Sequence, residues 1–90
     1  MTKHEIIDQI TRQSGLKRRE ISYIVDSFLG GVLNSLDGDD KVEIRGFGVF
    51  YRTVRKSRTL YSPIAKRSLD IPARSVVLFK ASKSTEREIQ

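Results

Sequence analysis

The sequence contains no cysteine and only one histidine, His4. Without cysteine, neither a disulfide nor a thiolate metal site can stabilise the fold. A chain of 90 residues buries a modest share of its surface, so its stability is marginal unless something else contributes. Because oligomerisation is the remaining common route to extra stability, we expect residues 1–90 to form one small domain that associates with further copies.

The chain also lacks an apolar run of the roughly 18 residues that a membrane span needs. Its first residues, MTKHEIIDQI, do not contain the apolar centre of a signal peptide. We therefore expect a soluble cytoplasmic protein without a membrane partner.

The residues that an enzyme needs are equally scarce. Catalysis requires a nucleophile, a base and an oriented partner, or a metal, and His4 lies near a predicted helix start, where we expect a solvated side chain. The acidic turn DGDD at 37–40 lacks the spaced ligands of a calcium loop. GFG at 46–48 is not followed by the Lys-Ser/Thr of a phosphate loop. We predict no enzymatic activity, catalytic residue, bound metal, cofactor or small-molecule substrate.

Acidic residues are almost absent from the middle and late chain. Residues 45–83 carry ten Lys and Arg but one acid, Asp70, whereas residues 1–44 carry six Lys and Arg and eight acids. The net charge of the whole chain is +6. This balance favours polyanionic partners, nucleic acid first and anionic membrane second.

Two helices are predicted in the first half. Thr2 followed by Glu5 fits a capping box, and Gly15 fits the left-handed residue that ends a helix. A second, amphipathic helix is predicted from about Lys17 to Leu36, because apolar residues recur at steps of three and four. These residues are Ile21, Ile24, Val25, Phe28, Leu29, Val32, Leu33 and Leu36.

Gly30 and Gly31 lie inside this second helix, where each costs about 1 kcal/mol relative to alanine. One interpretation is that they only weaken the helix. The other is that they let another helix approach its backbone closely.

Alternating and β-branched residues then predict an antiparallel meander. KVEI at 41–44 is a first strand, and RGFG connects it to two long strands, roughly 48–59 and 66–80, that form a hairpin. Ser62–Ala65 is predicted to be a type I turn at its tip, with proline in second position. Pro72 cannot donate a ladder hydrogen bond, so an edge position or a bulge is expected there.

The predicted fold class is α+β. It comprises two N-terminal helices, a three-stranded antiparallel sheet with a long β-hairpin arm, and a short C-terminal helix capped by Ser82 or Ser84. We divide the domain into a helical part (1–40), a sheet with its arm (41–82, the arm at about 52–73) and the C-terminal helix (83–90).

Cations line both strands of the predicted hairpin, at even and odd positions alike. Since burying unpaired charges is costly, neither face can pack on a core, and the hairpin should project into solvent from a body that holds its base. A solvated edge protected by charge is the plainer interpretation. The near absence of acids instead favours a clamp for a polyanion, formed by Arg52, Arg55, Lys56, Arg58, Lys66, Arg67 and Arg74.

The tip of the hairpin is apolar, although cations flank it. Phosphate contacts supply affinity without sequence information, whereas proteins that bind the minor groove often insert Pro, Ile, Leu or Phe between base steps and kink the duplex. Pro63 and Ile64 fit that role.

Four features together resemble the bacterial HU and integration host factor family: RGFGVF at 45–50, the basic hairpin with a proline at its tip, IPARSVVLFK at 71–80, and the helical first half. The resemblance implies an intertwined dimer, here expected to be a homodimer, whose helices form a shared base and whose two arms embrace double-stranded DNA in the minor groove. It also implies a histone-like, nucleoid-organising function: largely sequence-independent binding that bends or compacts DNA. A sequence-preferring architectural protein like integration host factor is the alternative.

The resemblance also implies roles for individual residues. The dimer core would contain Phe28, Leu29, Val32, Leu36, Phe47, Phe50 and Phe79. Pro63 would intercalate, and the further DNA contacts would come from Lys3, Arg45, Arg52, Arg55, Lys56, Arg58, Tyr61, Ser62, Ile64, Lys66, Arg67, Arg74, Lys80 and Lys83.

The tip departs from the family pattern, which reads close to GRNPxTG. Here the same positions, 60–66, read LYSPIAK. The proline is kept, but both glycines, the arginine and the asparagine are replaced. The resemblance therefore does not extend to the geometry of the tip or to the strength of bending.

Two rival functions use other parts of the sequence. Lys17, Arg18 and Arg19 at the start of the second helix resemble a helix-turn-helix junction, although the long apolar stripe of that helix favours a structural role. Alternatively, the apolar tip docks on a protein or an anionic membrane, for which four apolar residues make a weak anchor.

Overall fold

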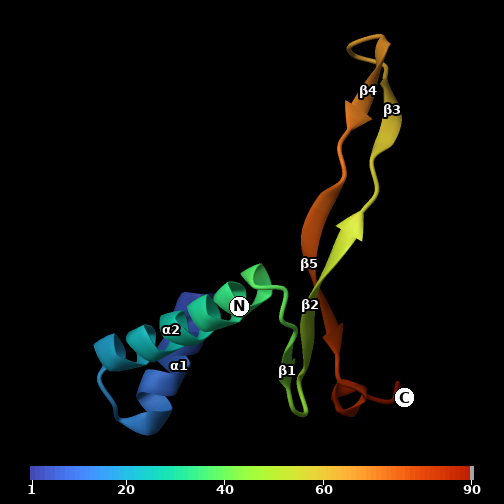
Figure 1. The fold of residues 1–90 in the computed structure, drawn as a ribbon. Coiled ribbons are helices and arrows are strands. Elements are labelled where there is room, and N and C mark those ends of the chain that lie inside the picture. Colours follow the sequence, from blue (N-terminus) through green and yellow to red (C-terminus); the bar gives the residue numbers. More distant parts are fainter. Residues whose placement is uncertain (90) are drawn as a thin grey trace. The chain divides into compact units, whose positions relative to one another are not determined.

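The computed structural model describes residues 1–89 (Figure 1). The chain divides into two compact units, Met1–Ser35 and Leu36–Gln90. The first unit is helical, and the second contains all the strands. Among the described residues, no helix is long and apolar enough to cross a membrane.

Helix α1, Lys3–Ser14, has the ends that the sequence predicts. At its start, Thr2 Oγ1 accepts a hydrogen bond from the N–H of Glu5 at 3.2 Å, and the same hydroxyl donates to the Glu5 carboxylate at 3.3 Å. At its end, Gly15 adopts a left-handed φ of 71°, and its N–H donates to the carbonyl of Thr11. The predicted caps Thr2 and Gly15 are therefore confirmed, although the Glu5 carboxylate meets the Thr2 hydroxyl and not the backbone N–H of a full capping box.

Helix α2, Arg18–Asp37, ends within one residue of each predicted limit. In the helical unit, Ile7, Ile21 and Val32 are buried. Two exposed ion pairs connect the helices, Lys3 to Asp26 at 2.8 Å and Arg18 to Asp8 at 2.7 Å.

The strands form two antiparallel sheets along one ribbon (Figure 1). The inner sheet has the order β1-β2-β5, with bounds Val42–Ile44, Gly48–Arg55 and Arg74–Ala81. The outer sheet pairs β3 with β4, with bounds Arg58–Ser62 and Arg67–Ile71.

The two long strands predicted from the sequence are each interrupted, which corrects their bounds. The first breaks at Lys56-Ser57 and the second at Pro72-Ala73. Proline has no N–H to donate to a ladder, so the pairing stops where Pro72 lies. The three-stranded sheet and the hairpin arm are otherwise as expected.

Gly48, which follows the turn between β1 and β2, lies very close to Phe79 and Lys80. A Cβ on Gly48 would lie 2.5 Å from the ring of Phe79 and 2.5 Å from the carbonyl oxygen of Lys80, so only glycine fits there. Phe79 also packs against Phe47 and Phe50, with ring centroids 5.2 and 4.7 Å away. Phe47, Phe50 and Phe79, which are predicted to lie in a dimer core, thus form an aromatic cluster within a single chain.

The predicted C-terminal helix is wrong in extent. Only a 3-10 turn, Lys83–Thr85, forms, and Glu86 is already extended, with φ −66° and ψ 147°. Ser82 caps this turn as expected, while the hydroxyl of Ser84 donates to the carbonyl of Gly46 at 3.1 Å. Serine hydroxyls that bond the backbone in this way compete with helix formation. Gln90, the last residue of that prediction, lies outside the described residues.

Candidate nucleic-acid interface

Six arm cations are exposed and are free of internal partners. Within residues 1–89, none of their side chains forms an ion pair or hydrogen bond. Asp70, the acid of the arm, accepts a hydrogen bond from the Thr59 hydroxyl at 3.1 Å instead. Six guanidinium and ammonium groups are thus available to an external anion: Arg55, Lys56, Arg58, Lys66, Arg67 and Arg74.

Arg52 differs from these six because its guanidinium already has partners. Its Nε donates to the carbonyl of Leu36 at 2.8 Å, and one terminal nitrogen pairs with the Asp37 carboxylate at 2.8 Å. The other lies 3.4 Å from the Ser75 hydroxyl. A cation at a helix C-terminus satisfies free carbonyls and complements the helix dipole. The structure therefore gives Arg52 a capping role at the end of α2, which the sequence did not suggest.

The tip is a four-residue turn closed by the register pair Ser62↔Arg67. The Ser62 hydroxyl accepts a hydrogen bond from the N–H of Ala65 at 3.2 Å, which agrees with the predicted turn at 62–65. Lys66 has a left-handed φ of 53°. That conformation explains why the family pattern has glycine at this position.

The apolar residues of the tip point into solvent. Ile64 is 97% exposed and Tyr61 is 65% exposed, and Pro63 is exposed as well. On the ribbon behind them, Leu60 lies directly opposite Leu69, and both are about 40% exposed. Leu69 is not among the site residues predicted from the sequence, because its position opposite Leu60 depends on a cross-strand register that only the folded hairpin shows.

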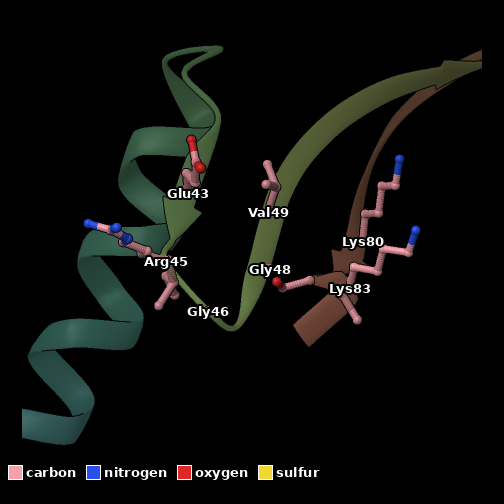
Figure 2. A pocket seen from close by; sticks show the side chains of 10 residues that line it. Glu43, Arg45, Gly46, Gly48, Val49, Lys80 and Lys83 are labelled. Carbon is pink, nitrogen blue, oxygen red and sulfur yellow. The ribbon is translucent and has the colours of Figure 1, made fainter. Parts of the chain in front are cut away.

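A second group of cations lies at the base of the sheet. Lys80 and Lys83 extend side by side, whereas Arg45 points away from them (Figure 2). All three line an open groove of about 390 Å³, together with Glu43 from β1. In the helical unit, Lys3 is half-exposed and paired with Asp26, so a phosphate would compete with that carboxylate for it.

Large apolar side chains are exposed on α2 and beside the aromatic cluster. Phe28 is 55% exposed, Leu29 44%, Phe47 51% and Phe79 42%, and Phe50 is half-buried. The other two residues predicted in a dimer core, Val32 and Leu36, are buried within the single chain. Each of the two units thus exposes large apolar side chains.

The rival helix-turn-helix interpretation loses support from Arg18. Its Nε donates to the Asp8 carboxylate, and its terminal nitrogen lies 3.4 Å from the His4 ring. The hydrogen bond from Arg18 lowers the pKa of Asp8 below its usual value of 3.8, against an opposing effect of burial. Arg18 is thus bound to α1 rather than presented to a groove of DNA.

Comparison with known proteins identifies the family. The family described as "Bacterial DNA-binding protein" matches residues 1–90. The DNA-binding protein HU of Thermus thermophilus is 33% identical over 90 residues, which cover 100% of this chain and 93% of that protein. The integration host factor subunit beta of Shewanella sediminis is 34% identical, with 99% and 95% covered.

Two solved structures share the fold. An Anabaena HU–DNA cocrystal structure aligns with a TM-score of 0.86 at 27% identity, over 93% of this chain and 91% of that one. A mutant of HU from Thermotoga maritima aligns with a TM-score of 0.67 at 30% identity, over 93% and 92%. Since the family matches every residue and these relatives align along the full chain, the protein belongs to the bacterial DNA-binding protein family that includes HU and integration host factor.

Proposed function

We propose that two copies of the chain grip duplex DNA between their basic β-arms and bend or compact it, with little dependence on base sequence. The observation that carries this proposal is a two-stranded ribbon with an exposed apolar tip and six exposed cations that have no partner within the described part of the chain, 1–89. The family description and the HU–DNA cocrystal support DNA as the partner. Phosphate contacts position a protein on the duplex without reading its sequence.

The dimer gives the exposed apolar residues a partner. We assign residues 1–40 to dimerisation and 41–82 to the sheet and DNA-binding arm, within one domain. Phe28 and Leu29 would then be covered by the second copy, and folding would be coupled to association. As a family member, the protein would act in the bacterial nucleoid, in the cytoplasm, as an architectural protein and not as an enzyme.

At the tip, Pro63 and Ile64 are placed to enter the minor groove and separate a base step. The flanking cations Arg58, Lys66 and Arg67 would hold the phosphates on either side. Tyr61 and Ser62 complete the contacting surface, and Arg45, Lys3, Lys80 and Lys83 would bind DNA beside the body.

A salt titration of duplex binding tests the proposal. Because each neutralised phosphate releases counterions, log K should fall linearly with log salt concentration. Arg67→Gln should reduce the slope by about 1 and weaken binding to all sequences alike. Anionic vesicles at the same salt serve as the control for a membrane partner. Affinity that is independent of salt, or stronger for vesicles than for DNA, would reject the proposal.

A sequence-preferring function is the second candidate, because the beta subunit of integration host factor is 34% identical to the chain. The two candidates can be distinguished by selecting the duplexes that bind from a pool of random DNA sequences. Enrichment of one sequence would favour this candidate, whereas enrichment only of flexible or A·T-rich DNA would favour shape-dependent binding.

A further inference from the structure

Strand β5 forms a free edge of the inner sheet along its whole length (Figure 1). The sheet order is β1-β2-β5, so β5 pairs with β2 on one side and with no strand on the other. Among residues 1–89, no backbone group of β5 forms a hydrogen bond outside that pairing. Such an edge presents a row of N–H and C=O groups that can pair with another chain.

The middle of this edge carries no charge. Ser75–Phe79 contains no ionisable residue, and Val77 and Phe79 are 37% and 42% exposed. Edges that resist association usually have charged side chains, proline or a bulge within them, whereas here the charges of β5 lie only near its ends, at Arg74 and Lys80. The strand has 8 residues, compared with 3 in β1 and 5 in each strand of the outer sheet.

Two copies of this edge match each other in one antiparallel register. Two-fold symmetry places one residue opposite itself, because neighbouring pairs of an antiparallel ladder alternate in type. The two longest overlaps have the axis at Val77 or at Leu78. An axis at Val77 opposes Arg74 to Lys80 twice, and like charges there destabilise pairing. An axis at Leu78 opposes no like charges, and its pairs are Leu78–Leu78, Val77–Phe79, Val76–Lys80 and Ser75–Ala81.

The two strands of such a pair run in opposite directions. The arm continues β2 and β5 beyond their last register pair, Arg55↔Arg74 (Figure 1). The arms of two copies joined at β5 therefore leave the shared sheet at opposite ends, and they cannot embrace one duplex. The edge contact is thus distinct from the interface of the DNA-gripping dimer. Since each gripping dimer has two β5 edges, the contact can connect one dimer to the next.

We propose that β5 is an interaction surface for a second copy of the chain: β5 pairs with β5 about a two-fold axis at Leu78 and connects neighbouring gripping dimers. Two sheets of three strands become one sheet of six. Because the arms lie at opposite ends of that sheet, connected dimers hold separate duplexes and bridge them. The bridging rests on the proposed binding of duplex DNA, whereas the edge pairing does not.

Cysteine cross-linking without DNA tests the pairing, since the chain has no cysteine of its own. With a mild oxidant, Leu78→Cys should form a disulfide with the same residue of a second copy. Val76→Cys is the matched control on the same face of β5. The two copies of that residue are separated by four residues along the ladder, about 13 Å, which is too far for a disulfide.

The cross-linked Leu78→Cys protein should sediment as a species larger than a dimer. No cross-link in Leu78→Cys, or equal cross-linking of the two variants, would overturn the inference. A cross-linked product that sediments as a dimer would place the contact inside the gripping dimer and would overturn it as well.

Charges placed at an opposed pair test the register. In the Leu78→Cys background, Ser75→Lys/Ala81→Lys puts lysine opposite lysine twice and should lower cross-linking several-fold. Ser75→Lys/Ala81→Glu should restore it, because opposite charges then face each other. Both replaced side chains are exposed, and the two double variants share the change at Ser75. Equal cross-linking in the two would contradict the register.

Capture of a fluorescent duplex by a biotin-labelled duplex measures bridging. The parent protein and the Lys/Glu variant should capture the second duplex. The Lys/Lys variant should bind single duplexes at least as tightly as the parent but capture several-fold less. If the cross-links form and no DNA is bound, the edge contact stands and the proposed function fails. If all three proteins bind and capture equally, the proposed function stands and the bridging is wrong.

Discussion

At the scale of single residues, the tip has a lysine, Lys66, where the family pattern has a glycine. Lys66 holds a left-handed φ of 53°, which costs a residue with a Cβ roughly 1–2 kcal/mol. In return, the tip gains an exposed cation next to Pro63 and Ile64. The turn is nevertheless formed, because Ser62 accepts the N–H of Ala65 and proline fixes its own φ.

Lys66→Gly should therefore rigidify the tip, whereas Lys66→Ala should not. Both variants remove the same charge, and only glycine relieves the backbone strain. Amide hydrogen exchange at residues 62–67 measures the effect, and exchange should be slower in the glycine variant by up to about tenfold, the ratio for about 1.4 kcal/mol. Equal exchange in the two variants would mean that the left-handed conformation costs nothing here.

At the scale of elements, Arg52 and Arg55 occupy the same strand but have different tasks. Arg52 donates to the last turn of α2 and pairs with Asp37, whereas Arg55 has no partner within the described residues. Removing Arg52 takes away a charge-assisted hydrogen bond to the carbonyl of Leu36, which keeps, among the residues described, only the N–H of Asp39 at 3.1 Å as a donor. A hydrogen bond from a charged group contributes about 1.5–3 kcal/mol before its exposure is considered.

We therefore expect Arg52→Gln to change mainly stability and Arg55→Gln to change mainly DNA binding. Arg52→Gln should lower the free energy of unfolding by about 1 kcal/mol with a small effect on the salt slope of DNA binding. Arg55→Gln should change stability by less than about 0.5 kcal/mol and reduce the slope by about 1. Chemical denaturation and binding titrations of both variants check this. The reverse pattern would mean that Arg52 acts mainly as the predicted DNA contact and Arg55 mainly in stability.

Some features of the helices and strands can be predicted from the sequence, whereas others cannot. The caps of α1 depend on residues three or four positions apart, so Thr2, Glu5 and Gly15 predict them directly. Pro72 predicts an irregularity in its own strand, but the matching break at Lys56-Ser57 in the other strand is known only from the register of the folded hairpin. The sequence predicts a helix in the tail with Ser82 or Ser84 as its cap, but the Ser82 hydroxyl accepts the N–H of Ser84 and the Ser84 hydroxyl donates to the carbonyl of Gly46. The capping role of Arg52 likewise needs an acceptor 16 residues away.

At the scale of the whole molecule, the exposed apolar side chains need a second copy of the chain to cover them. Large apolar side chains of α2 and of the aromatic cluster are exposed in a single chain, where they would favour association. Among residues 1–89, no neighbouring atom lies within 4 Å of a Cβ placed on Gly30 or Gly31, so their faces of the helix are open to a partner.

Thermal stability should therefore rise with protein concentration. Phe28→Ser should lower Tm and shift the protein towards monomer in sedimentation, because it removes side-chain area from the interface. Ile64→Ser is the control: it deletes an equally apolar but 97% exposed side chain at the tip and should leave Tm unchanged. A Tm that does not depend on concentration, with Phe28→Ser at least as stable as the parent, would contradict the dimer.

In the proposed function, two basic arms hold DNA while their apolar tips deform it. End-to-end fluorescence energy transfer on a short labelled duplex measures this directly, with saturating protein and with Pro63→Ala/Ile64→Ala as the comparison. We predict that the parent protein brings the duplex ends closer, and that the variant, with every arm cation in place, still binds but bends the duplex less. A duplex that stays straight with the parent protein, or bends equally with both, would contradict the account.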